Sequence, residues 1–488
     1  MTQGASRRGR PGAGAAGRAD VAGAGAAGVD VAALRERIRA LMPGVRRDLE
    51  ALVRIPSVSA PASDPRHVEA SAAAVAELLR GTGLPQVEVL RVEGGGPAVV
   101  GRRAAPRGAP TVLLYAHHDV QPPGEEDLWD TPPFVPTERD GRLYGRGAAD
   151  DKAGIAVHVA ALRALEDDPA VGVTVFVEGE EEIGSPTFRQ FLATHREQLA
   201  ADVIVVADSG NWRVGEPALT TSLRGLVDGV VSVTVLDHSV HSGMYGGAVP
   251  DAMTAMIKLL ATLWDDDGDV AVPGLVCGEA DDLGYGEALL RADAGVLDGV
   301  RLVGSGRLES RLWTRPALTV TGIDAPSVAA ASNTLLPATR VKFTLRIPPG
   351  QDPRAALVAL RDHLIAHAPW GARVEVVAGE AGRPWAGRLD GPVYDLARWA
   401  LEQAWGRRPV LMGIGGSIPF IPEFGQVYPT ATVLLTGVED PDTRAHGTNE
   451  SVDLGELERA CLAETLLLAA LASGGPGPAE RLARGAAR

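Results

Sequence analysis

The stretch LLYAHHDVQP, residues 113–122, places two histidines and an aspartate directly after an apolar run. In extended backbone, residues i and i+2 point to the same side, and residue i+1 points away. His117 and Asp119 therefore share a side, and His118 faces elsewhere, as a packing or surface residue. A carboxylate beside a metal-binding imidazole orients the ring and raises its basicity. The pattern predicts His117 as a metal ligand and Asp119 as its partner, with an exchange of the two histidines as the alternative.

Four further polar groups follow apolar runs, and each has an ordinary explanation when taken alone. Two aspartates, of which Asp150 is the first, precede a predicted helix over residues 154–165, where an aspartate often only caps the helix. Three consecutive glutamates, residues 180–182, end another run, and carboxylates are costly in a buried position unless cations compensate them. Asp208 and His446 lie in predicted loops. The informative observation is that these groups occur at equivalent places along the chain.

The elements that position these groups are buried strands. The strands are predicted from short runs rich in Val and Leu, over residues 111–116, 173–178, 202–207 and 430–435. They alternate with helical patterns, which are clearest over residues 31–53, 71–80 and 454–471. Such an alternation indicates an α/β fold, with a mainly parallel sheet that helices cover on both faces.

The carboxyl ends of the strands in an open α/β sheet share one crevice, and ligands bind there. Two imidazoles and three carboxylates that converge on this crevice suit two divalent ions of the Zn, Co or Mn type. Two such ions, ~3.5–4 Å apart, can share a bridging carboxylate and a bridging water. The sequence therefore predicts a metal centre at the ends of the strands.

A second domain is predicted inside the first. Residues 221–384 follow the order β-α-β-β-α-β, which is that of the ferredoxin-like unit. The first domain then comprises residues 31–220 and 385–475. Residues 1–30, rich in Gly, Ala and Arg, are expected to be disordered because they offer little apolar surface to bury, and residues 476–488 are expected to form a flexible tail.

Together these motifs resemble those of the di-zinc aminoacylase/carboxypeptidase G superfamily, and most closely those of its carnosinase-like dipeptidases. The matching segments stand in the family's order between residues 30 and 475: HHDVQP, LYGRGAADDKAG, EGEEEIGS, ADSGNW, VHSGMYGG, LRIPPGQDP, GGSIPF and AHGTNES. The resemblance implies a di-zinc exopeptidase fold in which the inserted domain serves as a lid and dimerisation domain.

The resemblance also implies a set of metal ligands. Asp150 would bridge both metals. His117 and Asp208 would complete the shell of one metal, and Glu182 and His446 that of the other.

The resemblance assigns the proton transfer to Glu181, as the general base that deprotonates the bridging water. This role fits the chemistry, because a metal lowers the pKa of a bound water towards ~7, within reach of a carboxylate. The assignment within residues 180–182 depends on the Gly-Ser that follows them, and the alternative shifts it by one residue.

Further roles implied by the resemblance lie on the inserted domain and near residue 417. His241 would reach the active site of a neighbouring subunit and stabilise the tetrahedral oxyanion. Arg346 and Ser417 would hold the free carboxylate of the substrate, a group that an arginine fork suits. Either Asn333 or Thr334 lies near another substrate-contacting position.

Composition and charge argue against other classes of function. The formal net charge is -15 and the pI is near 5.2, which argues against a nucleic-acid partner. The stretch from Gly145 lacks the third glycine and the Gly-Lys-Ser/Thr of a nucleotide-binding fingerprint. No apolar run reaches the ~18 residues that a membrane span needs. Cys277 and Cys461 are far apart and indicate neither a disulfide framework nor a thiolate zinc site, which fits a cytoplasmic location.

The sequence thus predicts a cytoplasmic, homodimeric di-zinc metallopeptidase that hydrolyses dipeptides or similar short peptides with a free C-terminal carboxylate. Manganese and cobalt are the alternatives to zinc. Hydrolysis of N-acyl amino acids or carbamoyl amides is the alternative activity, because that chemistry uses the same ligands. A catalytically silent metal-binding scaffold is the alternative outside enzymes; it predicts the replacement of a ligand or of the base, and none is replaced.

Overall fold

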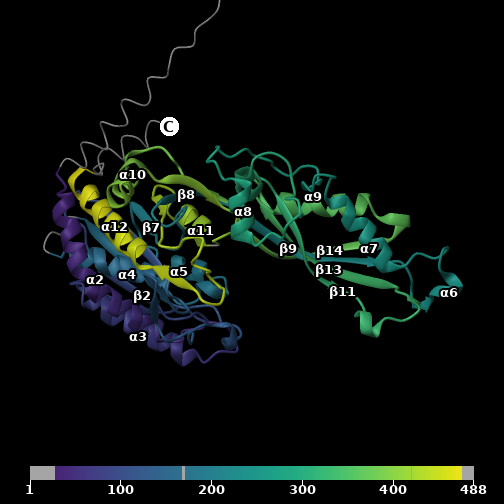
Figure 1. Cartoon of the computed structure of the whole chain (residues 1–488), viewed down its shortest axis with the longest axis horizontal. Coiled ribbons are helices and arrows are strands. Elements are labelled where there is room, and N and C mark those ends of the chain that lie inside the picture. The colour runs from purple at the N-terminus through teal and green to yellow at the C-terminus, as the bar shows by residue number, and fades with distance from the viewer. Residues whose placement is uncertain (1–27, 167–170, 419, 475–488) are drawn as a thin grey trace, which may run out of the picture. The chain divides into compact units, whose positions relative to one another are not determined.

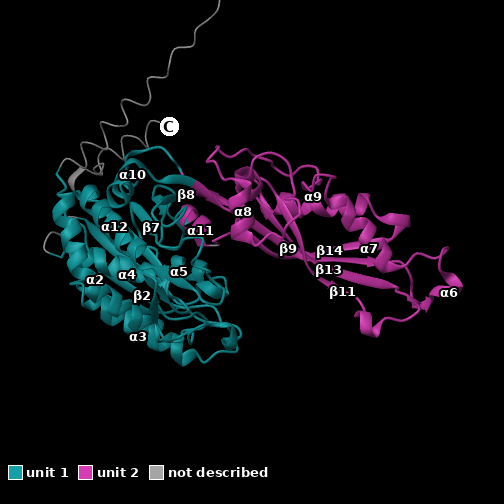
Figure 2. Ribbon diagram, viewed as in Figure 1, with its two compact units in different colours: residues 1–219, 388–411, 427–488 teal, residues 220–387, 412–426 magenta. Residues whose placement is uncertain are grey.

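The computed structural model describes residues 28–166, 171–418 and 420–474 of the 488-residue chain. The chain divides into two compact units, shown in different colours in Figure 2. Unit 1 comprises residues 1–219, 388–411 and 427–488, and unit 2 comprises residues 220–387 and 412–426. The predicted N-terminal tail lies outside the described residues up to residue 27, and the predicted C-terminal tail lies wholly outside them.

Residues 412–426 belong to unit 2, although the sequence pattern placed them in the first domain. Their contacts explain the difference. Arg224 Nε donates to the carbonyl of Gly415 at 3.0 Å, and Thr221 Oγ1 donates to the carbonyl of Met412 at 3.0 Å. These bonds join the segment to the start of unit 2, which lies about 190 residues away in the sequence and which no local pattern could connect to it.

The sheet of unit 1 has parallel strands at its centre. Its strands follow the order β1 (Gln86–Leu90), β2 (Ala98–Arg103), β6 (Gly172–Glu178), β3 (Thr111–His117), β7 (Val203–Val206) and β17 (Thr432–Leu435). The last four of these strands run parallel to one another, whereas β2 pairs antiparallel with both β1 and β6. In the sheet order, β17 is followed by β8 (Ala218–Leu223), which begins in unit 1 and continues into unit 2, and with which β15 (Trp385–Ala386) and β16 (Val410–Ile414) pair.

Helices cover both faces of this sheet, as predicted for an α/β fold (Figure 1). On one face lie α2 (Val31–Val53), α3 (Pro65–Arg80), α4 (Lys152–Ala164), α10 (Pro392–Trp405) and α12 (Leu454–Gly474). Their apolar residues form one core cluster with Val112 and Leu114 of β3. On the other face, Phe188 and Phe191 of α5 (Phe188–Thr194) pack against Phe176, and Phe188 also packs against Tyr115 of β3. Alternate residues of β3 thus serve opposite faces, as the pleat of a strand requires.

The second helix starts earlier than its apolar pattern suggested. It was predicted over residues 71–80, and α3 begins at Pro65. The Asp64 side chain accepts a hydrogen bond from the backbone N–H of Arg66, and proline suits the first turn because its missing N–H would have no helical partner there. Capping, rather than burial, therefore sets the start of this helix.

Unit 2 contains the predicted β-α-β-β-α-β order. The elements are β9 (Gly225–Thr234), α7 (Ala252–Leu260), β11 (Ala317–Asp324), β13 (Ala338–Ile347), α9 (Pro353–Ala366) and β14 (Arg373–Gly382). The four strands form an antiparallel sheet in the order β11-β13-β9-β14. Apolar residues of α7 and α9 pack on one face of this sheet, and together they form the core of the unit.

Smaller elements complete the two units. In unit 1, β4 (Thr137–Arg139), β5 (Arg142–Tyr144) and β18 (Ser451–Asp453) form a three-stranded sheet. In unit 2, β10 (Val240–His241) pairs with β12 (Thr334–Leu335) and leads directly into α6 (Ser242–Tyr245), and α8 (Glu287–Ala294) lies between α7 and β11 in the sequence. The helix α11 (Phe420–Val427) follows β16. Within the described part of the chain, none of the helices combines the length and the hydropathy that crossing a membrane demands.

Candidate metal centre

The five predicted ligands all lie in unit 1, and each is placed by the end of a secondary-structure element. His117 is the last residue of β3. Glu182 lies in η2 (Glu181–Ile183), a short 3-10 helix that follows β6, and Asp208 lies two residues beyond β7. Asp150 precedes α4, and His446 lies in the loop between β17 and β18.

The carboxylate of Asp150 stands between the two imidazoles. Its Oδ1 lies 3.1 Å from Nε2 of His117, and its Oδ2 lies 3.0 Å from Nε2 of His446. The same Nε2 of His446 lies 3.2 Å from Oε2 of Glu182. One potential ligand atom from each of His117, Asp150 and Glu182 lies within 4.8 Å of the others. Each oxygen of Asp150 therefore faces a different histidine.

The centre has more acidic groups than cationic groups. Burial, with repulsion from the carboxylates of Asp150 and Glu182, raises the pKa of Asp208 to about 7, although the imidazoles of His117 and His446 oppose the rise. Burial, with repulsion from Asp208 and Glu182, likewise raises the pKa of Glu181 well above its usual value. Burial and mutual repulsion thus oppose the charged forms of both carboxylates, and a bound cation would compensate them. Imidazole nitrogens and carboxylate oxygens are ligands that divalent transition metals accept, so the residues present fit such ions.

Hydrogen bonds to Asp150 and Glu182 raise the pKa of His446 to about 11. Its side chain is nevertheless 58% exposed, unlike that of His117, which is 1% exposed. The backbone of His446 has a φ of 61°, in the left-handed region that non-glycine residues seldom adopt. The centre is thus open to solvent on the side of His446.

Asp119 and Gln121, which follow β3, bind the glutamates that follow β6. Asp119 accepts the backbone N–H of Glu181 on Oδ1 at 3.2 Å and that of Glu182 on Oδ2 at 3.0 Å. Gln121 returns the contact, because its backbone N–H donates to Oε1 of Glu182 at 3.1 Å and its Nε2 donates to Oε2 at 2.9 Å. The carboxylate of Asp119 also lies 3.5 Å from Nδ1 of His117. Asp119 therefore orders both the histidine and the acidic turn.

Sequence reasoning missed Gln121 and the second task of Asp119. The available signal was the period of two in extended backbone, since residues 117, 119 and 121 share a side. The structure uses that shared side to face the turn formed by residues 180–182.

The contacts of the three consecutive glutamates distinguish Glu180 from Glu182. Glu180 accepts the backbone N–H of Gly96 at 2.9 Å and both the N–H and the Oγ1–H of Thr187, at 2.8 and 2.6 Å. Its carboxylate is thus occupied away from the histidines, whereas that of Glu182 reaches His446. Glu182 is therefore the glutamate of the run that contacts His446, and the roles of Glu181 and Glu182 stay predictions.

His118 is a buried packing residue, as its alternation with His117 predicted. Its Nε2 lies 2.9 Å from the carbonyl oxygen of Pro97, and burial lowers the pKa of its ring. The exchanged assignment of the two histidines is therefore not favoured by the geometry.

The remaining predicted site residues belong to unit 2 and form two groups there. Arg346 Nη1 donates to Oγ of Ser417 at 2.9 Å. His241 is exposed, and its Nδ1 accepts the backbone N–H of Gly243 at 3.0 Å where α6 begins. Thr334 pairs with His241 between β12 and β10, and the carbonyl of Asn333 accepts the N–H of Ser242, so both candidates lie beside the histidine.

The model of peptidase family M20/M25/M40 matches residues 113–470, which is more than half of the chain. The chain belongs to this family and is a metallopeptidase. The matched region includes all five predicted ligands.

Particular relatives are dipeptidases. The cysteinylglycine-S-conjugate dipeptidase of Corynebacterium striatum is 35% identical over 438 residues, which cover 88% of this chain and 96% of the relative. The β-Ala-His dipeptidase of Homo sapiens is 30% identical over 372 residues, which cover 70% of this chain and 71% of the relative. Among solved structures, the dipeptidase Dug1p of Saccharomyces cerevisiae has a TM-score of 0.75 at 22% identity, covering 91% of this chain and 98% of that one. Human carnosine dipeptidase 1 has a TM-score of 0.74 at 24% identity, covering 91% and 99%. These structures share the fold.

Proposed function

We propose that this protein hydrolyses the peptide bond of dipeptides or short peptides with a free C-terminal carboxylate. The observation that carries the proposal is the placement of Asp150, whose two oxygens face different imidazoles beside a third acidic group, Glu182. A dipeptide substrate is supported by the relative that is 35% identical, because it is named as a dipeptidase and the match covers 96% of its length.

Two divalent ions occupy the centre in this proposal, most suitably zinc, with manganese or cobalt as alternatives. Asp150 would hold both ions, His117 and Asp208 would complete the ligands of one, and Glu182 and His446 would complete those of the other. Bound ions of this kind polarise a scissile carbonyl and make a water molecule a better nucleophile at neutral pH. The absence of cysteine from the ligand set leaves only nitrogen and oxygen donors, which all three metals accept.

Glu181 is the general base in this proposal. It takes a proton from the attacking water and passes it to the leaving amine. Its neighbours support the assignment, because Asp119 fixes its backbone N–H and its carboxylate belongs to the acidic group around His117 and Asp208. A positioned carboxylate contributes typically 10²–10⁴-fold in rate.

Residues of unit 2 bind the substrate and complete the site. Arg346 and Ser417, already joined by a hydrogen bond, hold the substrate carboxylate. His241 stabilises the oxyanion in the site of a partner subunit, so unit 2 acts as the lid and dimerisation domain of a homodimer. Its exposed position supports a role outside its own unit. A cytoplasmic location stays a prediction.

A substrate panel tests the activity. The purified chain is loaded with zinc, manganese or cobalt and offered dipeptides, the same dipeptides with an amidated C-terminus, and N-acetyl amino acids. We expect turnover of the free dipeptides and at least a tenfold loss of kcat/KM on amidation. Faster turnover of the N-acetyl amino acids than of the dipeptides would support the alternative activity, hydrolysis of N-acyl amino acids. If no substrate were turned over with any of the three metals, the proposal of hydrolysis would be refuted.

Neighbouring glutamates provide the test of the general base. Glu181→Ala should lower kcat by about 10²–10⁴-fold while the bound metal, measured by elemental analysis, stays near the wild-type amount. Glu180→Ala is the matched control, because Glu180 binds Gly96 and Thr187 instead. Equal losses of kcat in the two variants would contradict the role of Glu181.

A further inference from the structure

A completely buried carboxylate, that of Glu450, lies beside the metal centre without belonging to its predicted ligands. Its Oε1 accepts the backbone N–H groups of Ala149 at 3.1 Å and Asp150 at 3.2 Å. Its Oε2 accepts the N–H of Gly147 at 3.0 Å and Nη1 of Arg146 at 2.5 Å. All four donors come from the segment that leads into Asp150.

These bonds determine the path of that segment. The amides of Gly147, Ala149 and Asp150 precede α4 and find their acceptor in the Glu450 carboxylate, whereas that of Ala148 donates to the carbonyl of Gly145. A buried N–H without an acceptor costs about 1–3 kcal/mol, so one carboxylate that binds three of them restricts the local backbone strongly. The side chain of Asp150 projects from a backbone whose N–H is one of the three.

The same residue also anchors the loop of His446, which lies four positions before it. The carbonyl of Glu450 accepts the N–H of Gly145 at 3.0 Å. Arg146, held by the Glu450 carboxylate, donates from Nη2 to the carbonyl of Gly447 at 2.9 Å. The two segments that carry Asp150 and His446 are therefore bound to each other through Arg146 and Glu450.

We propose that Glu450 is a positioning residue that sets the distance between the bridging carboxylate of Asp150 and the imidazole of His446, and thereby the affinity of the centre for divalent metal. The inference rests on the proposed function, since it requires these two residues to be ligands. The hydrogen bonds of the Glu450 carboxylate go to backbone N–H groups and to Arg146. Its bonds to the backbone of Asp150 place it in the outer shell of the centre, where substitutions typically cost 10–100-fold in metal affinity.

Cobalt binding tests the proposal without reference to turnover. The metal-free protein is titrated with Co²⁺ in competition with a chelator, and the visible absorption of the bound cobalt reports the geometry of its ligands. Glu450→Gln places an amide NH₂ against donors, and we expect it to weaken Co²⁺ binding 10–100-fold and to change the spectrum. Glu450→Asp keeps the charge and should recover part of the lost affinity. Glu464→Gln is the matched control, because Glu464 is a buried carboxylate of unit 1 that pairs with His158 and should leave the affinity unchanged.

The outcomes separate this inference from the proposed function. Wild-type affinity and spectrum in Glu450→Gln would overturn the role of Glu450, even where the wild-type protein binds cobalt and hydrolyses dipeptides. An equal loss of affinity in Glu464→Gln would also overturn it, because any buried carboxylate would then produce the effect. A folded wild-type protein that binds no cobalt would instead refute the metal centre itself. Circular dichroism before each titration identifies variants that do not fold, and Glu450→Asp then carries the test.

Discussion

Among the described residues of unit 1, histidine and carboxylate side chains meet in two places, and their differences show what distinguishes a metal centre from a structural pair. At the centre, two histidines share an environment with Asp150, Glu181, Glu182 and Asp208. In the interior, His158 of α4 faces Glu464 of α12 alone, with Nδ1 2.9 Å from Oε1, and its Nε2 lies 3.0 Å from the carbonyl of Tyr115.

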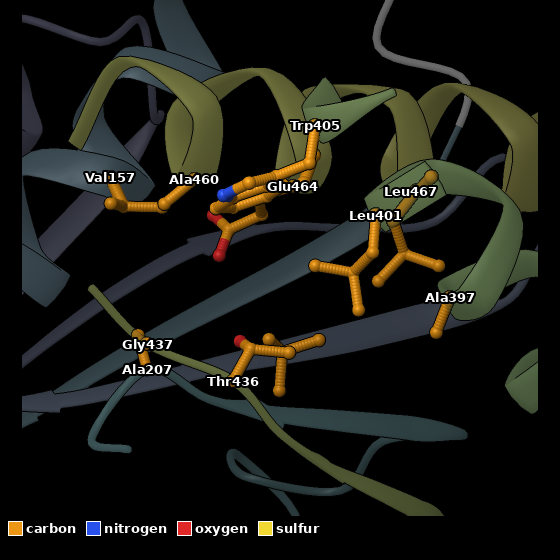
Figure 3. Close-up of a pocket in the computed structure, with 13 residues that line it drawn as sticks. Val157, Ala207, Ala397, Leu401, Trp405, Thr436, Gly437, Ala460, Glu464 and Leu467 are labelled. Atoms are coloured by element: carbon orange, nitrogen blue, oxygen red, sulfur yellow. The ribbon is translucent and has the colours of Figure 1, made fainter. Parts of the chain in front are cut away.

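The surroundings of the interior pair are apolar. Glu464 lines a small cavity with residues such as Val157, Leu401 and Leu467 (Figure 3). The side chains of His158 and Glu464 are 0% and 4% exposed. Glu464 is thus matched by one histidine, His158, whereas the carboxylates at the strand ends outnumber the two histidines there. The ratio of charges, and not the presence of a histidine beside a carboxylate, therefore marks the site that binds metal.

The largest expected effect is the loss of metal binding when Asp150 is replaced. Asp150→Asn replaces one of the two oxygens that face His117 and His446 by an NH₂ group, which cannot bind a metal. We expect Co²⁺ affinity to fall by more than the ~10–100-fold typical of outer-shell residues, and turnover to fall with it. Chelator competition and a dipeptide assay measure both quantities. Retention of two bound metals at wild-type affinity would show that Asp150 does not bridge them.

A smaller effect is expected at the interior pair, and on stability instead of metal binding. Glu464→Gln removes the carboxylate that holds His158, and breaking a buried pair from one side costs about 3–5 kcal/mol, so we expect a loss of about 3 kcal/mol. Urea unfolding of the metal-free protein measures it.

The pH dependence of that loss has a definite sign. Although burial lowers the pKa of His158, the charge of Glu464 and its hydrogen bond raise it more, and the net pKa is raised. A raised histidine pKa gives stability that is complete below the ordinary value of ~6.5 and is lost as the pH rises through the folded value. The difference between wild type and Glu464→Gln should therefore narrow in alkaline solution, and a difference that widens there would contradict the ion pair.

Much of this architecture could be predicted from the sequence, because the strands that carry the centre are fully buried. Apolar runs ended at His117 and before Asp208, and the convergence of strand ends placed these residues near each other. The alternation of side chains also separated His117 from His118.

What escaped prediction depends on backbone groups. Gln121 and Glu450 act through N–H groups of loops, and the position of such groups cannot be read from residue types. The placement of residues 412–426 in unit 2 likewise depends on carbonyls that accept bonds from Arg224 and Thr221. Side-chain patterns record burial, but they do not record which loop amide needs an acceptor.

The smallest expected effect is on the stability of the metal-free protein when Asp208 is replaced. Its sign is opposite to that expected for Glu464→Gln. Above pH ~7, Asp208 carries a charge that burial and the neighbouring carboxylates oppose, since its pKa is raised to about 7 from its usual 3.8. An acid with a raised folded pKa binds more protons in the folded state, so the stability of the metal-free protein falls as the pH rises from about 4 to 7. Asp208→Asn should remove this penalty and stabilise the metal-free protein at pH 8 by about 1–2 kcal/mol, because solvent near the partly exposed carboxylate weakens the repulsion.

Bound metal should reverse the order of stability of the wild type and the Asp208→Asn variant. Saturating Zn²⁺ stabilises whichever protein binds it more tightly, so the wild type should then unfold at the higher temperature. The measurement is a set of thermal unfolding curves at pH 4 and pH 8, with and without Zn²⁺. Near pH 4 without metal the two curves should nearly coincide, because Asp208 is then largely protonated in the folded state. An Asp208→Asn protein that is less stable than wild type without metal at pH 8 would show that Asp208 is compensated as Glu464 is, and the distinction between the two places would then fail.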